Sequence, residues 1–150
     1  MLSKSMVYNS CIKSVSDKIT AAGKAFKEIT EEAKTDSKSS AGDKHETSRA
    51  LMQMEQEKIS RQLQNMIDQK KQLEKINIDQ HSEKIITGSL ILTNQGYFFL
   101  SVGLGKITVK DTPVFVLSSG SPLGAKLTGL KKDDSTTING TNYIIIQIID

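Results

Sequence analysis

The sequence predicts an α+β protein in which an antiparallel helical hairpin precedes a small, mostly antiparallel β-domain with one short helix. A change of composition is the first observation. Up to about residue 80 the chain is rich in Lys, Glu, Gln and Ser and lacks proline, whereas Gly, Thr, Ile and Val dominate afterwards. The first part also carries two apolar stripes of helical period. The second part carries short β-branched runs between turn residues.

The two stripes step by four and three residues in alternation, as in a coiled coil. One contains Val15, Ile19, Ala22, Phe26, Ile29 and Ala33, and the other contains Met52, Gln56, Ile59, Leu63, Met66, Lys70 and Leu73. The segment from Thr35 to Glu46 has no apolar residue larger than alanine. Such a segment joins antiparallel helices, so we predict a hairpin over residues 1–78 and not a dimeric parallel coil. Arms of about 30 residues would be roughly 45 Å long.

Short runs rich in β-branched and aromatic residues predict the strands of a β-domain over residues 84–150, after a linker from Asn77 to Glu83. The predicted strands are Lys84 to Thr93, Gly96 to Val102, Lys106 to Val109, Val114 to Leu117 and Tyr143 to Ile149. Asn139-Gly140 predicts a type I′ hairpin turn, because both residues tolerate positive φ. Ser121 as N-cap, Pro122 at the first helical position and Gly129 at the end predict one short helix.

Composition excludes several classes of protein. The 150 residues are 37% hydrophobic and 5% aromatic, which is low for an enzyme with a large buried site. The formal charge of +3 is too small to indicate nucleic-acid binding by itself. The single Cys11 cannot form an internal disulfide and no long apolar run or leader is present, so we expect a cytoplasmic protein without a membrane partner. His45 and His81 lack neighbours at zinc-ligand spacing.

Two motifs of the chain carry a resemblance to a known family. Ser121-Pro122-Leu123-Gly124, Leu127 and the stretch from Gly129 to Asp134 are similar to the SP-[LI]-x-x-x-L-x-G-K-K-x-G-D pattern of the bacterial Gre transcript-cleavage factors, with departures at Leu130 and Asp133. The stretch from Gly42 to Thr47 is similar to the family's G-D-L-S-E-N hairpin tip. The resemblance covers most of the chain in the expected order, and it implies that the β-domain is FKBP-like.

The resemblance implies a transcription elongation factor that enters the secondary channel of RNA polymerase and stimulates its cleavage of backtracked RNA. Asp43 and Glu46 take the positions of the two tip carboxylates, which help to hold a Mg²⁺ ion shared with the polymerase. The nuclease would be the polymerase, so no independent catalysis and no cofactor bound to the chain alone are expected. The partners would be the polymerase and the nascent RNA 3′ end, with DNA only indirectly, and the factor would be a monomer.

Further contacts are expected on both parts of the chain. Basic residues near the tip, which are Lys34, Lys38, Lys44 and Arg49, would contact RNA phosphates or the channel wall. The resemblance also implies that the β-domain docks on the polymerase through Ser121, Pro122 and Leu123.

The residues themselves leave alternatives open. Asp-x-x-Glu is also a capping-box spacing, so Asp43 and Glu46 could serve the start of the second helix, and the basic residues could be a solvated helix face. Lys44 and His45 reduce the negative charge at the tip, and the family's Ala-Glu-Tyr after it is replaced by Ser48, Arg49 and Ala50. Two other functions therefore remain: a Gre-like regulator without cleavage activity, and a coiled-coil or peptide interaction module.

Overall fold

The structure is a computed structural model that describes residues 1–36 and 42–150, with side chains described for residues 1–34 and 46–150. The chain forms two compact units. One, the hairpin unit, is Ser14–Lys70, and the other, the β-unit, combines Met1–Lys13 with Lys71–Asp150. A long helical hairpin followed by a six-stranded sheet and one short helix confirms the predicted α+β class. None of the described helices combines the length and the apolar character that a membrane span needs.

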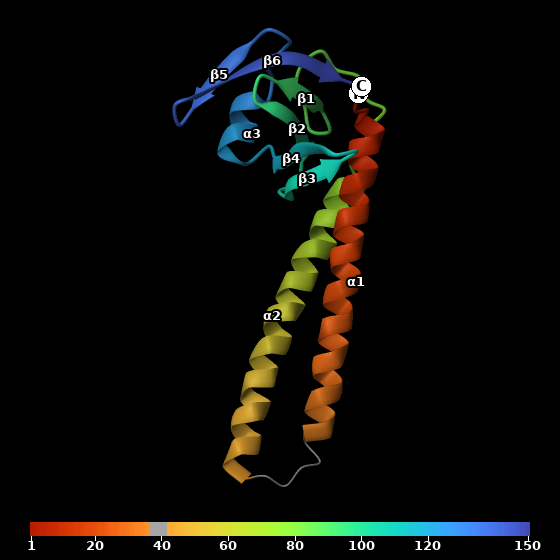
Figure 1. Ribbon diagram of the computed structural model, residues 1–150, viewed down its shortest axis with the longest axis vertical. Coiled ribbons are helices and arrows are strands. Elements are labelled where there is room, and N and C mark those ends of the chain that lie inside the picture. The colour runs from red at the N-terminus through yellow and green to blue at the C-terminus, as the bar shows by residue number, and fades with distance from the viewer. Residues whose placement is uncertain (37–41) are drawn as a thin grey trace. The chain divides into compact units, whose positions relative to one another are not determined.

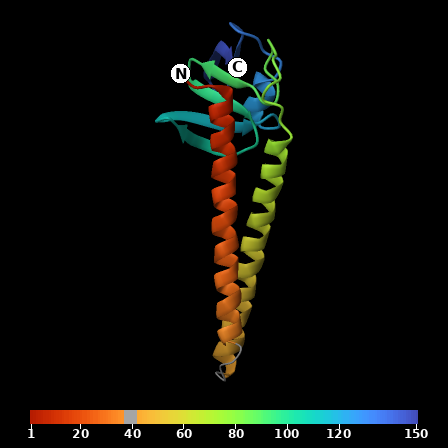
Figure 2. The same ribbon diagram turned by 90° about the vertical axis from the view of Figure 1, so that its right-hand side faces the viewer.

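Two long helices form the hairpin. α1 spans Lys4–Asp36 and α2 spans Gly42–Glu74, each with 33 residues, which corresponds to about 50 Å of helix. They run side by side in opposite directions (Figures 1 and 2), and the side chain of Gln56 donates a hydrogen bond across the pair to the Thr30 hydroxyl at 3.2 Å. The predicted antiparallel pairing within one chain is therefore confirmed.

The predicted connection between the helices was too long. We expected Thr35 to Glu46 to join the two helices, but α1 continues to Asp36 and α2 already begins at Gly42. Extending an existing helix by one residue costs little compared with starting one. Acidic residues are also favourable in a first helical turn, where the backbone N–H groups point out of the helix. Polar composition alone therefore overestimated the length of the connection, since the first helix reaches Asp36 and the second begins at Gly42.

The seam between α1 and α2 follows both predicted stripes. Every position of the two stripes is buried or half-buried. Within the described part of the hairpin unit, however, only Val15 and Ile59 are fully buried, with 1% and 8% of their surface exposed. The rest of the seam is half-buried, because two helices without a third neighbour leave one side of each apolar stripe open to solvent.

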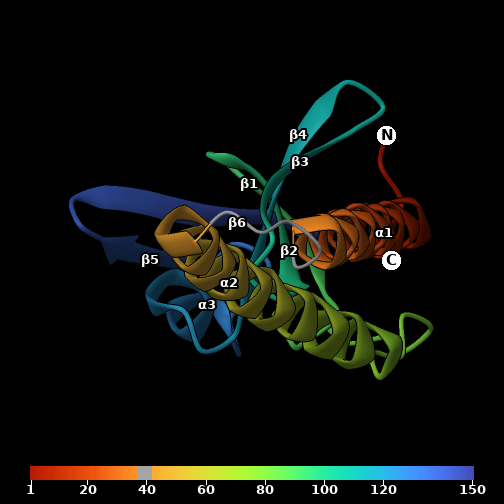
Figure 3. The same cartoon turned by 90° about the horizontal axis from the view of Figure 1, so that it is seen from below.

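Six strands form one mixed sheet in the β-unit. They are β1 (Leu90–Thr93), β2 (Gly96–Ser101), β3 (Gly105–Val109), β4 (Thr112–Ser118), β5 (Ser135–Ile138) and β6 (Thr141–Ile149), in the order β3-β4-β2-β1-β6-β5. Only the β2–β4 pair is parallel, so the expectation of a mostly antiparallel sheet is confirmed. β3 and β4 form the teal hairpin of Figure 3.

Alternation along the strands gives the sheet two apolar faces. One face is packed with α3 (Pro122–Leu127) in a core of Ile85, Ile91, Phe98, Leu100, Leu127 and Ile145. The register places Leu90, Phe99, Val116 and Ile149 on the other face, and all four are buried. The β-unit also buries Leu2, which precedes α1, and Val7, Cys11 and Leu73 of the two long helices.

Two strand predictions were wrong. The first predicted strand, Lys84 to Thr93, is interrupted because Gly88 adopts a φ of +96° and Ser89 closes a turn onto Ile86. Its early part instead exchanges backbone hydrogen bonds with the segment after α3, through Ile85 and Leu130. The second error is that β5 was not predicted, because its polar sequence did not resemble a strand. The predicted Asn139-Gly140 turn is confirmed by φ angles of 50° and 80°, and such a turn requires a strand on each side.

Candidate functional site

The start of α2 carries the two carboxylates that sequence analysis selected. Asp43 and Glu46 both lie within the first five residues of α2, directly after the short connection from α1. A separation of three residues places them on neighbouring positions of one helix face. Glu46 is exposed, whereas the side chain of Asp43 lies outside the described residues. The backbone thus presents a pair of acidic positions where the hairpin turns.

The basic residues of the same region are distributed over both helices. Lys34 is exposed in the last turn of α1, and Arg49 is exposed one turn after Glu46. Lys38 and the side chain of Lys44 lie outside the described residues. In the described part of the tip, one exposed cation therefore lies near the end of α1 and one near the start of α2.

This donor set suits a hard divalent cation only as part of a larger site. Carboxylate oxygens are the ligands that Mg²⁺ prefers, but two of them leave most of an octahedral shell to water or to another molecule. Among the described side chains, no three His, Cys, Asp or Glu residues converge on one point. Acidic residues in the first turn of a helix also interact favourably with its N-terminal N–H groups. The position is compatible with both roles.

A shallow groove runs along the hairpin beside this region. Its first section, of about 410 Å³, is lined by Thr30, Ala33, Lys34, Arg49, Met52, Gln53 and Gln56. Its second section, of about 440 Å³, is lined by Phe26, Gln53, Gln56, Glu57, Ser60 and Arg61. The shared residues Gln53 and Gln56 join the two sections, and both lie wholly within the hairpin unit. We refer to these two sections together as the seam groove.

Sequence reasoning missed the seam groove and also an exposed apolar pair on α2. Leu51 and Met54 are 62% and 65% exposed, although both are large apolar side chains. Both residues lie at positions outside the predicted stripe. A large apolar residue at such a position is the sequence signal that would have identified them. The groove itself gave no signal, because its residues are a mixture of stripe and flanking positions.

The three residues predicted for docking have local structural tasks. The Ser121 hydroxyl donates to the Ser118 carbonyl at 2.7 Å and accepts from the Gly124 N–H at 3.0 Å, so it is the N-cap of α3. Leu123 packs against the core, and only Pro122 is exposed. A Cβ atom at Gly124 would lie 2.0 Å from the Ser118 carbonyl oxygen, which explains the glycine. The motif therefore specifies the strand-to-helix turn between β4 and α3.

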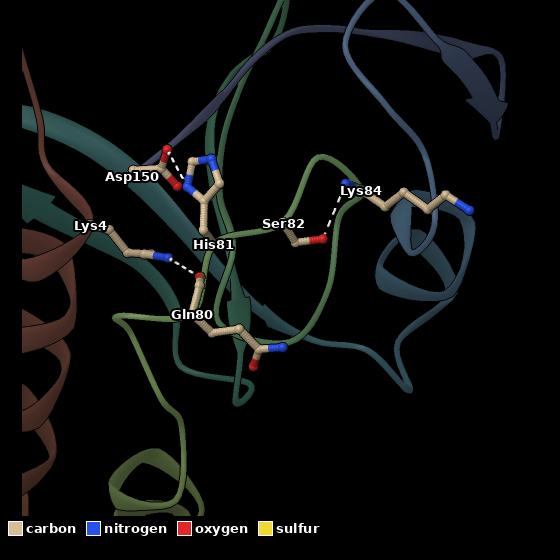
Figure 4. Close-up of polar contacts among 6 residues, drawn as sticks. All are labelled: Lys4, Gln80, His81, Ser82, Lys84 and Asp150. Carbon is tan, nitrogen blue, oxygen red and sulfur yellow. Dashed lines mark hydrogen bonds and ion pairs between the residues drawn. The ribbon is translucent and has the colours of Figure 1, made fainter.

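A polar cluster surrounds the linker of the β-unit (Figure 4). The buried Lys4 donates from its ammonium group to the Gln80 carbonyl at 3.0 Å, and His81 Nδ1 lies 2.9 Å from a carboxylate oxygen of Asp150. A depression of about 300 Å³ lies beside it, lined by His81, Ser82, Glu83, Lys131, Lys132, Gln147, Ile148 and Asp150. The lining contains nearly equal numbers of cationic and carboxylate side chains, so it favours neither an anionic nor a cationic ligand. The contacts of the cluster hold the linker in place.

Comparisons with known proteins add little at the level of sequence. No protein-family model matches the chain, and no curated protein matches it. Among solved structures, the chain is similar to that of the transcription factor Gfh1, with 15% sequence identity, 93% of each chain covered and a TM-score of 0.38. At this TM-score the likeness supports no argument about function, which has to come from the residues themselves.

Proposed function

We propose that this protein is a transcription factor that acts on RNA polymerase, with the start of α2 inserted toward the active site of the enzyme. One observation carries the proposal. Asp43 and Glu46 occupy neighbouring positions of one helix face in the first turns of α2, immediately after the connection between two antiparallel helices of 33 residues. The motif resemblance at the tip and around α3 supports the same conclusion.

The chemistry follows from the residues available. Asp43 and Glu46 would supply oxygen ligands to a Mg²⁺ ion that the polymerase also binds, and such an ion activates water for attack on a phosphodiester. The chain itself would orient the ion and contribute negative charge, while Lys34 and Arg49 contact the polymerase or the RNA backbone. On this proposal the bond that breaks is in backtracked RNA, and the polymerase remains the nuclease.

A related function is a Gre-like regulator that occupies the same channel without stimulating cleavage. One observation favours keeping it: Ser48, Arg49 and Ala50 stand where the Gre factors have Ala-Glu-Tyr, so a carboxylate and an aromatic ring of the family pattern are absent. Both functions require binding to the polymerase, and they differ in the fate of the transcript.

The experiment is a transcript-cleavage assay with a stalled, backtracked polymerase complex, analysed as a gel of RNA ends. The wild-type protein should accelerate cleavage in the presence of Mg²⁺, and Asp43→Ala and Glu46→Ala should each abolish most of the acceleration. Glu55→Ala is the matched control, because Glu55 is an exposed carboxylate farther along α2 and its loss should leave cleavage unchanged.

Three outcomes separate the alternatives. If both tip variants accelerate cleavage as strongly as the wild-type protein, the proposed role of the carboxylates is wrong. Polymerase binding with slowed cleavage identifies the regulator. Failure of the protein to copurify with RNA polymerase removes both functions together.

A further inference from the structure

The hairpin unit leaves its own seam incomplete. Its apolar stripes have the spacing of a coiled coil, yet among the described side chains of this unit only Val15 and Ile59 are buried. Phe26 and Met52 are half-buried and line the seam groove. Apolar side chains that stay half-exposed at the centre of a helical seam gain further burial when another element covers them.

The dimensions of the seam groove fit a helix better than a small molecule. Along α2 the groove extends from Arg49 to Arg61, which corresponds to about 18 Å of helix. It is open to solvent and shallow, whereas sites for small ligands enclose most of the ligand surface. On α2 its outer wall is formed by Arg49, Gln53, Glu57 and Arg61, which are spaced by four residues. A row with this spacing is a ridge of the kind that packs against a neighbouring helix.

The charges on the groove select an acidic partner. Lys34, Arg49 and Arg61 contribute three cations to the lining and Glu57 the one carboxylate. Neither Arg49 nor Arg61 forms an ion pair within the part of the chain that the structure describes. Guanidinium groups at the rim of an apolar groove attract carboxylates and add specificity to the contact.

A second copy of this chain is a poor occupant. A symmetric contact through the groove would bring Arg49 and Arg61 of one copy toward the same residues of the other. Like charges placed against each other in this way disfavour association.

We propose that the seam groove binds an acidic amphipathic helix of another protein. The apolar side chains of that helix cover Phe26 and Met52, and its flanking carboxylates face Arg49 and Arg61. The bound helix completes a three-helix bundle in which the half-buried seam becomes a closed core. This site shares Lys34 and Arg49 with the proposed polymerase contact but does not use the tip carboxylates. Peptide binding is measured without polymerase, and cleavage is tested with the carboxylate variants, so either proposal can fail without the other.

Binding of designed peptides to the full chain tests the site. The probe is a fluorescein-labelled amphipathic helix of about 18 residues, long enough to span the groove, with Leu on one face and Glu on its flanks. Its counterpart carries Lys at every Glu position. Fluorescence anisotropy should show that the acidic peptide binds at least about tenfold more tightly than the basic one, with an affinity that falls as salt is added.

Charge reversal then locates the site. The double variant R49E/R61E should weaken binding of the acidic peptide about tenfold and strengthen binding of the basic peptide. The matched control is K58E, which makes the same type of change at an exposed position of α2 outside the groove. Circular dichroism of each variant shows whether the helices are retained.

Methionine methyl NMR provides a second measurement that does not depend on any variant. Met52 lines the groove, whereas Met54 is exposed outside it on the same helix. The acidic peptide should shift the Met52 methyl signal and leave that of Met54 in place. Equal binding of both peptides, an unaffected R49E/R61E variant, or a shift at Met54 alone would overturn the proposal. A concentration-dependent dimer that excludes the peptide would also overturn it, in favour of a second copy.

Discussion

The hairpin unit and the β-unit bury their apolar side chains to very different extents. In the β-unit both faces of the sheet carry side chains such as Phe99, Leu100 and Ile145 with no exposed surface. In the hairpin unit the seam is mostly half-buried. The comparison predicts that most of the stability comes from the β-unit, where side chains pack closely on both sides of the sheet. The hairpin holds its shape through helix propensity and a thin seam, which leaves its surface available for contacts.

Truncation of a phenylalanine to alanine should lower the free energy of unfolding much more in the β-unit than in the hairpin unit, and this is the largest effect that we expect. Phe99→Ala removes a fully buried ring and should lower the free energy of unfolding by about 3–5 kcal/mol. Phe26→Ala removes a half-buried ring of the seam and should cost about 1 kcal/mol. Urea denaturation followed by far-UV circular dichroism measures both. Equal losses would mean that the hairpin is as tightly packed as the β-unit.

Two glycines should respond to alanine in opposite directions. Gly124→Ala places a Cβ atom against the Ser118 carbonyl and should destabilise the β-unit by about 1–3 kcal/mol. Gly23 lies in the middle of α1 with open space around it, so Gly23→Ala should stabilise the hairpin by about 0.5–1 kcal/mol through helix propensity. Thermal unfolding of both variants provides the measurement. A stabilised Gly124→Ala protein would contradict the close approach of β4 and α3.

Alkaline pH should weaken the β-unit through two groups at the base of α1. Burial raises the pKa of the Cys11 thiol from 9.0 to about 12. Burial, and to a smaller extent Glu74, also raises the pKa of the Tyr8 phenol, which donates to the Leu73 carbonyl at 3.0 Å. Both groups are protonated in the folded state and titrate more easily when unfolded. The stabilisation from Cys11 is therefore complete below pH 9.0 and is lost as pH rises toward about 12, and the raised pKa of Tyr8 acts in the same direction.

The expected slope for Cys11 is about 1 kcal/mol of unfolding free energy per pH unit in this range. Denaturation of the wild type and of Cys11→Ala at about pH 8 and about pH 10 measures it. The variant should lose less stability between the two conditions. A wild-type protein that reacts rapidly with a thiol reagent at about pH 8 would show that the base of α1 is not closed.

Much of the architecture was predictable because the periodicity of apolar residues is a local property. The stripes through Val15 and Ile59 predicted both helices and their pairing, and Ser121, Pro122 and Asn139-Gly140 predicted α3 and the turn between β5 and β6. The chemistry of these caps and turns involves neighbours within a few residues. The acidic pair at the start of α2 was selected through the resemblance of Gly42 to Thr47 to the Gre hairpin tip, and its role stays a prediction.

Other features depended on contacts between distant segments. Tertiary structure decided that Ile85 pairs with Leu130 rather than extending β1, and that Leu123 packs against the core. It also decided how deeply each seam residue is buried, which created the groove between Phe26 and Arg61. The sequence by itself determined which elements form and where they turn, because those choices are made by local backbone preferences. Burial and grooves arise only when separate elements pack, so the periodicity of one helix could not specify them.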